Sequence, residues 1–456
     1  MKEKIVNLIA DHVEGMTAEE IATFIEIPPK QELGDYAFPC FRLAKTMHKA
    51  PNLIAADIKE AIGDVDFLDK IDVQGAYLNF FVKKDIFVQT MIEAALKDNF
   101  GGSDEGADKV ICIDYSSPNV AKNFHVGHLR TTIIGNSLYK IYSKLGYKVI
   151  RINHLGDWGT QFGKLIVAYK NWGTKEAVEK DGVAELMRLY VKFHEEADKN
   201  PELVDEARAW FSKMEHGDEE ALSIWQWFKD ISLVEYKRTY DLLGMDFDYY
   251  LGESFYRDKC QDVVDQLTNA NLLKESEGAM IVDLSDYDMA PCIVTKKDGS
   301  SIYATRDLAA IFYRKNTYHF TKCLYVTGQE QKLHFAQVFK VVELLGNDWA
   351  KDSLVHIPYG LVSLEGAKLS TRSGNIIYAE DILHDAIKKS FEIISEKSPN
   401  LPDKEEVAKI VGVGSVLFND LYNQRIKDVS FSWDKVLNFD GETGPYVQYT
   451  HARCSS

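Results

Sequence analysis

Two short apolar runs separated by a helical pattern constrain the fold of this chain more than any other feature. Residues Val110 to Ile113 are all apolar, which is typical of a parallel strand buried on both faces. From about residue 127 to 143, apolar residues recur at helical spacing, and Gly146 is placed to end that helix. Residues 149–152 then form the next predicted strand. A strand, a helix and a strand in this order predict a nucleotide-binding βαβ unit, and so an α/β fold.

With 456 residues, the chain is longer than a single domain with one hydrophobic core usually is, so several domains are expected. Residues 1–95 form one predicted α/β module. In that module, alternating apolar residues between Ile71 and Val82 predict two strands joined by a turn at Gly75. The glycine-rich segment 100–106 that follows is predicted to be a linker.

The remainder of the chain divides by its pattern into a nucleotide-binding domain and a helical C-terminal part. The nucleotide-binding domain is expected at residues 107–380. It is interrupted from about residue 162 to 280 by a mostly helical, acidic insertion. From about residue 400 to 456 the pattern is helical again. We find no internal repeat in the sequence.

Composition limits the environment and the partners of the chain. With 53 Lys and Arg against 70 Asp and Glu, the net charge is −17, which argues weakly against nucleic acid because phosphate binding needs cations. A local basic track can nevertheless exist on an acidic protein. The six cysteines are scattered, so we expect a reducing cytoplasm and no disulfide framework. The sequence lacks a run of about 18 apolar residues and a secretory signal, so no membrane partner is expected.

The first chemical motif lies between the first predicted strand and its helix. It contains His125, Gly127 and His128, at the carboxyl end of the strand where such folds bind ligands. A helix N-terminus offers free N–H groups to phosphate, and two imidazoles three residues apart can both face a triphosphate. Gly127 removes a side chain where a base could approach the backbone. The plainer interpretation is a pair of surface histidines at the start of a helix.

A second motif is the short polar stretch at residues 368–375, which carries Lys368, Ser370 and Arg372. A loop with two cations can close on a leaving pyrophosphate and stabilise charge as it develops. The alternative is a solvated turn with two incidental cations.

The two motifs resemble the two signatures of class I aminoacyl-tRNA synthetases. The flanking residues narrow the resemblance to arginyl-tRNA synthetases, and the resemblance covers essentially the whole chain. It implies a Rossmann-like catalytic domain with a helical insertion, an N-terminal α/β module that contacts tRNA, and the start of an α-helical anticodon-binding domain. The stretches that carry it, beside the signatures, are Gly34–Tyr36, Ser117–Lys122, His128–Arg130, Asn153–Gly163, Tyr303–Asp307 and Gln331–His334.

The resemblance also assigns an arginine-binding pocket. A guanidinium is planar, permanently charged and donor-only, so its pocket needs a carboxylate and acceptors or an aromatic face. By resemblance, Asp307 pairs with the guanidinium while Tyr303 and Gln331 shape the pocket. The α-amino and carboxylate end would be held by Ser117, Asn119 and Asn153. For Asp307 the alternative is an ordinary carboxylate at a helix start, with the neighbouring Arg306 as its partner.

The reaction that the resemblance implies is the ligation of L-arginine to tRNA(Arg) through arginyl-adenylate, with ATP as a substrate and Mg²⁺ accompanying it. The enzyme would act by positioning and electrostatics rather than through a covalent nucleophile. No editing site is expected. The residues expected to stabilise charge are His125, His128, Lys122, Lys368 and Arg372; those expected to contact ATP are His125, Gly127, His128, Lys368 and Ser370.

Two departures from the family pattern stand out. The second signature usually carries another lysine where this chain has Thr371, and we expect Arg372 and Lys122 to supply the missing charge. Residues 444–453 resemble the beginning of a helical domain that in the family continues for about a hundred residues more. We therefore expect a C-terminally truncated chain of weak activity. We also expect a monomer.

Three rival functions follow from the same residues. The chain could be a synthetase for another amino acid or a small nucleotidyltransferase, but Tyr303, Asp307 and Gln331 argue against both. It could also be a non-catalytic module that binds RNA or a partner protein. The signature residues count against that last function, and the expected missing domain counts for it.

Overall fold

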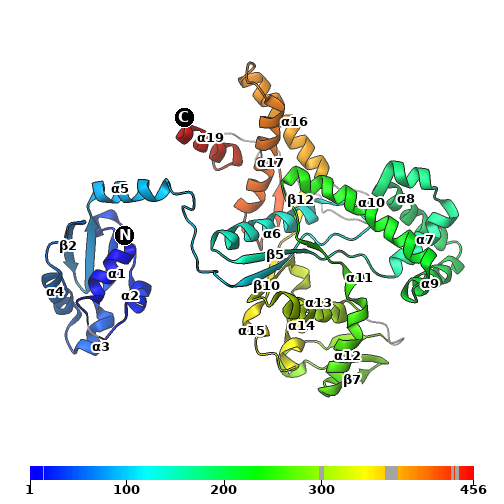
Figure 1. The fold of residues 1–456 in the computed structure, drawn as a ribbon, viewed down its shortest axis with the longest axis horizontal. Helices are drawn as coiled ribbons and strands as arrows, with labels where there is room; N and C mark the ends of the chain where they lie inside the picture. The colour runs from blue at the N-terminus through cyan, green and yellow to red at the C-terminus, as the bar shows by residue number, and fades with distance from the viewer. Residues whose placement is uncertain (14, 297–301, 365–377, 433–435, 437–440) are drawn as a thin grey trace. The chain divides into compact units, whose positions relative to one another are not determined.

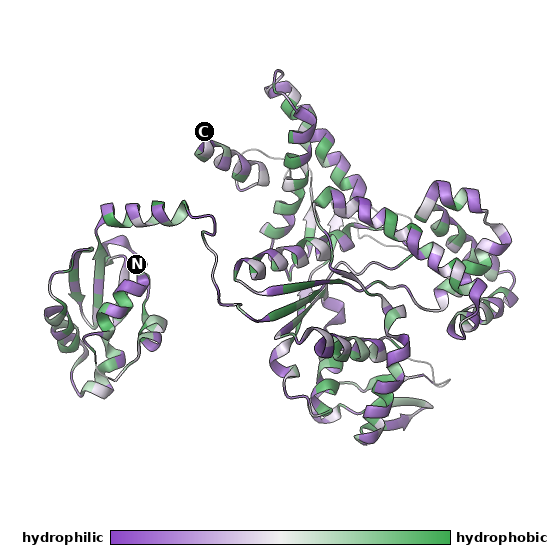
Figure 2. Ribbon diagram, viewed as in Figure 1, coloured by the Kyte–Doolittle hydropathy of each residue, from purple (hydrophilic) through white to green (hydrophobic). Residues whose placement is uncertain are grey.

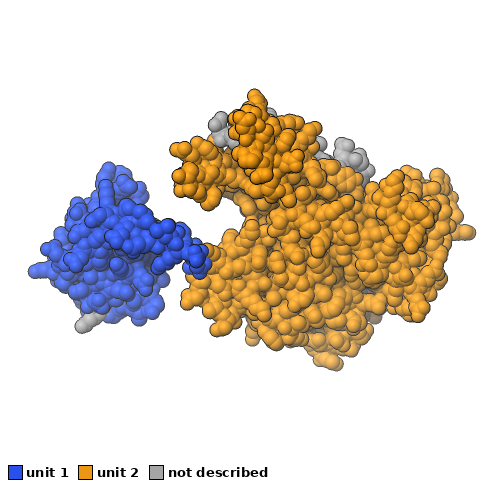
Figure 3. All heavy atoms as spheres, turned by 45° about the horizontal axis from the view of Figure 1, so that its top comes forward, with its two compact units in different colours: residues 1–102 blue, residues 103–456 orange. Residues whose placement is uncertain are grey.

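The computed structural model describes the chain in two compact units, Met1–Gly102 and Ser103–Ser456 (Figure 3). Each unit is considered by itself below. The described residues are all except 14, 297–301, 365–377, 433–435 and 437–440. Among the described helices, none is both long enough and apolar enough to cross a lipid bilayer.

The first unit is a three-stranded antiparallel sheet packed against helices. Its strand order is β1-β3-β2. The two predicted strands and the turn between them are confirmed, and Gly75 in that turn has a φ of +62°, which favours glycine. Alternate residues of β3, such as Leu78 and Phe80, are fully buried under the helices. The elements are α1 Lys2–Ala10, α2 Ala18–Phe24, β1 Tyr36–Pro39, α3 Ala44–Met47, α4 Pro51–Ile62, β2 Leu68–Gln74, β3 Tyr77–Val82 and α5 Lys84–Ala95.

A five-stranded parallel sheet forms the centre of the second unit (Figure 1). Its order is β11-β10-β4-β5-β6, so the predicted βαβ unit is confirmed as β4-α6-β5. The chain leaves β4 toward β5 on one side, and β10 lies on its other side. Ligands bind at such a reversal of strand order, at the carboxyl ends of the strands. The elements are β4 Val110–Asp114, α6 Val126–Lys144, β5 Lys148–Asn153, β6 Tyr249–Tyr250, β10 Lys322–Gly328 and β11 Leu354–Tyr359.

The sheet is covered on both faces, which explains the continuous apolar runs of its strands. Figure 2 shows apolar residues concentrated in these strands. Along β4, Ile111 and Ile113 enter the core shared with α6, whereas Cys112 points into the opposite core with Leu308 and Ile311. Burying each such aliphatic side chain contributes roughly 1.5–3 kcal/mol. The covering helices are α10 Glu219–Leu243, α16 Ala379–Lys397 and α17 Lys404–Tyr422 beside α6, and α12 Cys260–Asn269, α13 Tyr303–Tyr318 and α14 Lys332–Leu344 on the other face.

Between β5 and β6 the chain forms four helices around a core of their own. They are α7 Thr160–Trp172, α8 Lys175–Ala197, α9 Glu202–Glu215 and α10 Glu219–Leu243 (Figure 1). The predicted helical range of about 162–280 also contains a hairpin strand. Glu277 and Gly278 have φ values of +50° and +85°, which is the backbone of a tight hairpin turn. The further elements are α11 Glu253–Tyr256, β7 Leu273–Ser276, β8 Ala279–Val282, β9 Cys292–Thr295, α15 Ala350–Ser353, β12 Val362–Leu364, β13 Val429–Phe431 and α19 Gly444–Ser455.

A buried ion pair connects helix α13 to the carboxyl ends of the central strands. Arg314 of α13 is fully buried, and its Nη2 lies 2.8 Å from Oδ2 of Asp114 at the end of β4. The same nitrogen lies 3.2 Å from Nδ1 of His154, which follows β5. Because a guanidinium only donates, His154 accepts through Nδ1 and carries its proton on Nε2. One cation therefore connects two neighbouring strand ends to one helix.

We predict that Arg314→Met lowers the free energy of unfolding of the second unit by about 3–5 kcal/mol, because it leaves the Asp114 carboxylate buried without its cation. The double variant Asp114→Asn, Arg314→Met should regain much of that loss. Urea unfolding measures both. Lys199→Met, which removes an exposed pair with Glu196, is the control and should have little effect. An Arg314→Met protein as stable as the control would contradict the prediction.

Candidate active site

A cavity of about 520 Å³ lies where β4 and β10 end. It brings together six of the residues that the sequence singled out, from three separate motifs: Ser117, Asn119, His125, Gly127, His128 and Gln331. Gln331 reaches it from a short 3₁₀ turn, Gln329–Gln331, directly after β10. The convergence follows from the parallel order of the strands, since their carboxyl ends share one edge.

The loop after β4 is held in an unusual conformation. Ser116 and Ser117 have φ values of +71° and +47°, in the left-handed region that non-glycine residues rarely adopt. Side-chain hydrogen bonds hold them there. Ser117 Oγ donates to Asp114 Oδ1 at 2.9 Å, and Ser116 Oγ lies 2.7 Å from the hydroxyl of Tyr240. Strain stabilised by its surroundings in this way is common at functional sites.

The next turn of this loop runs against the segment after β5. Asn119 and Gly156 form a parallel bridge, and the Val120 N–H donates to the Gly156 carbonyl. A Cβ atom at Gly156 would come within 2.1 Å of Asn119 Oδ1. A side chain at Gly156 would therefore require the Asn119 side chain to move out of this contact. Asn119 is thus fixed from behind while it lines the cavity.

The two histidines stack on each other at the start of α6. Their ring centroids are 3.9 Å apart with planes 23° from parallel. His125 Nδ1 accepts from the Gly127 N–H at 3.1 Å, and His128 Nδ1 accepts from the His125 N–H at 3.3 Å. Both protons are therefore assigned to Nε2, which leaves each ring one N–H donor.

Burial determines the charge of this pair. It is the largest cause that lowers the pKa of His125 and of His128, and the positive charge of Lys122 lowers both further. Both rings are consequently neutral at pH 7. The pair therefore offers hydrogen bonds, rather than positive charge, beside the N-terminus of α6.

The cationic residues expected at the site have different outcomes. Lys122 is exposed, and its Nζ lies 5.9 Å from the ring centroid of Tyr190 in α8. Its effect on both histidines is electrostatic. The residues expected in the second signature lie outside the described residues, so their placement stays a prediction: Lys368, Ser370, Thr371 and Arg372.

Helix α13 begins at Tyr303 and presents Asp307 one turn later, as the spacing predicted. The Asp307 carboxylate lies 2.6 Å from Nε2 of His334. Arg306, the alternative partner of Asp307, forms its ion pair with Glu253 instead, at 2.7 Å. Glu253 is buried, and burial raises the pKa of its carboxyl to about 7. The contacts of Asp307 are thus with a histidine rather than with its neighbour.

Asp307 is not among the residues that line the 520 Å³ cavity, and two other predicted residues, Asn153 and Tyr303, also lie apart from that lining. Asn153 is fully buried, and its Nδ2 donates to the Tyr240 hydroxyl at 2.9 Å. Tyr303 is 64% exposed and lines a neighbouring cavity of about 630 Å³ with Gln161 and Arg306. The structure therefore connects Asn153 to the site through Tyr240, and it places the Tyr303 ring at the surface, with the Arg306 guanidinium carbon 5.6 Å from the ring centroid.

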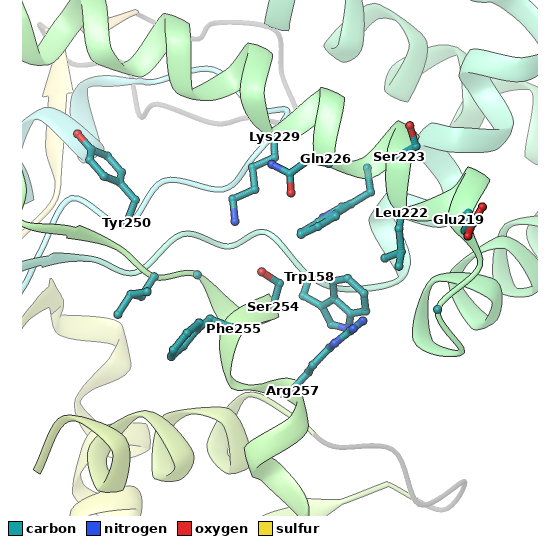
Figure 4. Close-up of a pocket in the computed structure, with 14 residues that line it drawn as sticks. Trp158, Glu219, Leu222, Ser223, Gln226, Lys229, Tyr250, Ser254, Phe255 and Arg257 are labelled. Atoms are coloured by element: carbon teal, nitrogen blue, oxygen red, sulfur yellow. The ribbon is translucent and has the colours of Figure 1, made fainter. Parts of the chain in front are cut away.

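A further cavity of about 600 Å³ lies between α10 and α11 (Figure 4). Trp158, Lys229 and Arg257 line it, and Trp158 also borders the cavity of Tyr303. Beneath it, the fully buried Asp157 accepts from Lys229 Nζ at 2.6 Å and from Ser254 Oγ at 2.7 Å. These bonds connect α10 of the helical insertion to α11, which follows β6, and we therefore interpret the residues around this cavity as a structural connection.

Sequence reasoning missed the side of the cavity that comes from β10, β11 and the segment before β13. Nothing local in the sequence indicates that these segments flank β4, because the pairing spans about two hundred residues. His334 and Arg314 had a weak signal. His334 is three residues from Gln331, the residue that caps α14, and Arg314 is seven residues from Asp307, which places that second pair on one face of α13. The missed lining residues include Thr327, Gly328, Glu330, Tyr359, Gly360 and Asp428.

Comparison with known proteins identifies the family. Residues 90–433 match the family model described as tRNA synthetases class I (R), catalytic domain, and residues 2–82 match the arginyl tRNA synthetase N terminal domain. An arginine–tRNA ligase of Alkaliphilus metalliredigens is 58% identical over 100% of this chain and 81% of its own length. One from Clostridioides difficile is 56% identical over 99% of this chain and 80% of its own.

Solved structures show the same fold. The arginyl-tRNA synthetase of Thermus thermophilus superposes with a TM-score of 0.79 at 23% identity, covering 99% of this chain and 81% of the other. That of Plasmodium falciparum gives 0.75 at 22% identity, over 99% and 79%. The predicted fold class is thereby confirmed. From the family models and the relatives more than half identical over its whole length, this chain belongs to the arginyl-tRNA synthetases, a family of ATP-using class I aminoacyl-tRNA ligases.

Proposed function

We propose that the cavity at the ends of β4 and β10 ligates L-arginine to tRNA(Arg), using ATP and passing through arginyl-adenylate. One observation carries this proposal. The stacked pair of His125 and His128 at the start of α6 shares a cavity with Ser117, Asn119 and Gln331. Phosphate-binding groups and candidate amino-acid ligands therefore face one volume, as the joining of an amino acid to a nucleotide requires.

In the first step the arginine carboxylate attacks the α-phosphorus of ATP, and pyrophosphate leaves. The Nε2–H groups of His125 and His128 donate to phosphate oxygens, and the N-terminus of α6 adds its partial positive charge. Gly127 keeps the backbone open to the nucleotide. Lys122, Lys368 and Arg372 supply positive charge to the leaving group, and Ser370 contacts ATP. In the second step the terminal ribose of tRNA attacks the activated carbonyl.

The arginine substrate lies between two ends of the site. Its guanidinium meets the Asp307 carboxylate, beside Tyr303 and Gln331. Its α-amino and carboxylate groups meet the loop after β4, where Ser117 and Asn119 are held rigidly. Asn153 contributes indirectly, through its hydrogen bond to the Tyr240 hydroxyl, which in turn contacts Ser116. A rigid site of this kind rejects ligands that leave its polar groups unpaired, so editing is not needed.

The remaining partners follow from the same proposal. Mg²⁺ enters with the phosphates of ATP, since that ion is usually held by substrate phosphates with one or two carboxylates. Residues 1–95 contact tRNA, the catalytic domain spans residues 107–380 with its insertion at about 162–280, and residues 400–456 begin the anticodon-binding part. The chain acts as a monomer in the cytoplasm. The free thiols of all six cysteines support that compartment.

ATP–pyrophosphate exchange tests the function directly. Exchange that requires both arginine and tRNA(Arg) is the expected result, because the resemblance implies that tRNA binds before arginine is activated. Exchange with a different amino acid would overturn the proposal. If the chain binds tRNA and supports no exchange even when the expected C-terminal domain is restored, the non-catalytic alternative is favoured.

Asp307→Asn should raise the KM for arginine on the order of 100-fold, because a charge-assisted bond is lost and the guanidinium loses its counter-charge. The KM for ATP should change little, since the carboxylate does not face the nucleotide. Steady-state exchange measures both constants. Asp265→Asn, on the exposed face of α12, is the matched control. An unchanged KM for arginine would show that the guanidinium binds elsewhere.

Lys122→Ala should lower the rate of adenylate formation by about tenfold or more, because one positive charge near the phosphates is removed. Arginine affinity should stay close to that of the unaltered protein. Single-turnover kinetics separate the two quantities, Lys122→Arg should retain most of the rate, and Lys175→Ala on exposed α8 serves as control. Equal losses in rate and affinity would exclude the proposed role of Lys122.

A further inference from the structure

The carboxylate proposed to receive the arginine guanidinium is already bound by a second side chain. His334 of α14 places its Nε2 2.6 Å from Oδ2 of Asp307 on α13. The side chains are 28% and 21% exposed, so the contact is partly shielded from water. The imidazole is itself packed edge-on against Phe335, with ring centroids 5.3 Å apart. The ring is thus supported on one side and bound to the carboxylate on the other.

The direction of this bond is set by chemistry. An ionised carboxylate only accepts, so Nε2 of His334 donates. The donated bond uses one lone pair of Oδ2. The same bond restrains the rotation of the carboxylate about its side-chain torsions. A planar, forked guanidinium requires such a fixed carboxylate plane more than a point charge does.

We propose that His334 is a positioning residue for arginine, acting through Asp307. This inference rests on the proposed function, because it assumes that the guanidinium binds at that carboxylate. His334 lies one helical turn beyond Gln331, which lines the nucleotide cavity. Through its bond to Asp307, His334 therefore connects the proposed guanidinium-binding carboxylate to the segment that follows β10. The binding of arginine costs less entropy when the carboxylate is already oriented.

The neighbourhood of the pair is consistent with this role. The carboxylate of Asp307 acts electrostatically on the buried Glu253 and on His154. His154 in turn contacts Arg314, which is on the same helix as Asp307. An Asp307 side chain without its histidine partner could rotate among these polar groups. The bond to His334 selects one orientation.

The test compares His334→Ala with His334→Gln in arginine-dependent pyrophosphate exchange with tRNA(Arg) present. The alanine variant should raise the KM for arginine about tenfold, since the carboxylate must be ordered during binding. Its KM for ATP and its kcat should change less than about twofold. Glutamine keeps an N–H donor and should restore most of the loss. His384→Ala, which removes an exposed histidine near Glu380 on α16, is the matched control with no expected effect.

A double variant separates positioning from a general structural effect. If His334 acts only through Asp307, then adding His334→Ala to Asp307→Asn should raise the KM for arginine no further. Losses that multiply, or an alanine variant with an unchanged KM, would overturn the inference. The proposed function fails separately, if Asp307→Asn alone leaves the KM for arginine unaltered. Melting temperatures of all variants identify any that fail to fold, and the glutamine variant then carries the comparison.

Discussion

The ion pair between Asp114 and Arg314 is the interaction on which the geometry of this site depends most. It places a fully buried cation at the ends of β4 and β5. Without that cation, only water would order the backbone groups and side chains at these strand ends. Because Arg314 is two helical turns beyond Asp307 on α13, it also fixes that helix against the sheet. The separation between Asp307 and the loop after β4 is thereby set.

A second, neutral set of contacts holds the same loop from the opposite side, and it comes from the helical insertion. The Tyr240 hydroxyl bridges Ser116 and Asn153. Earlier on α10, the Tyr236 hydroxyl lies 2.7 Å from the Asn119 and Lys122 carbonyl oxygens. These contacts satisfy polar groups of a loop whose conformation is unusual, which a buried loop requires. The helical insertion therefore helps to hold the loop after β4 in place, in addition to forming a separate part of the protein surface.

The predictable parts of this structure are those whose information is local. Strand β4, helix α6 and strand β5 follow from apolar periodicity, and the place of the histidines follows from their position between a strand and a helix. The neighbours of β4 in the sheet depend on pairing over about two hundred residues, so one wall of the cavity was not predicted. Strand β7 and the turn that joins it to β8 were missed, because that turn is Glu277-Gly278 rather than an asparagine or aspartate followed by glycine. Arg314 was missed because a cation on a helix is ordinarily solvated, and only the fold shows its burial.

The neutrality of the histidine pair changes how charge must be distributed during the reaction. Protonating either ring would place a cation in a buried position next to another imidazole and near Lys122, which is unfavourable on both counts. The pair can therefore orient phosphate oxygens without binding pyrophosphate as tightly as two cations would. Positive charge for the leaving group must then come from the N-terminus of α6 and from groups that approach from outside the buried floor. Lys122, which is exposed, is the group that we expect to supply this charge among the described residues, and Lys368 and Arg372 are the further candidates from the sequence. A neutral histidine pair, with the positive charge supplied by other residues, suits an enzyme that must bind a triphosphate and later release its product.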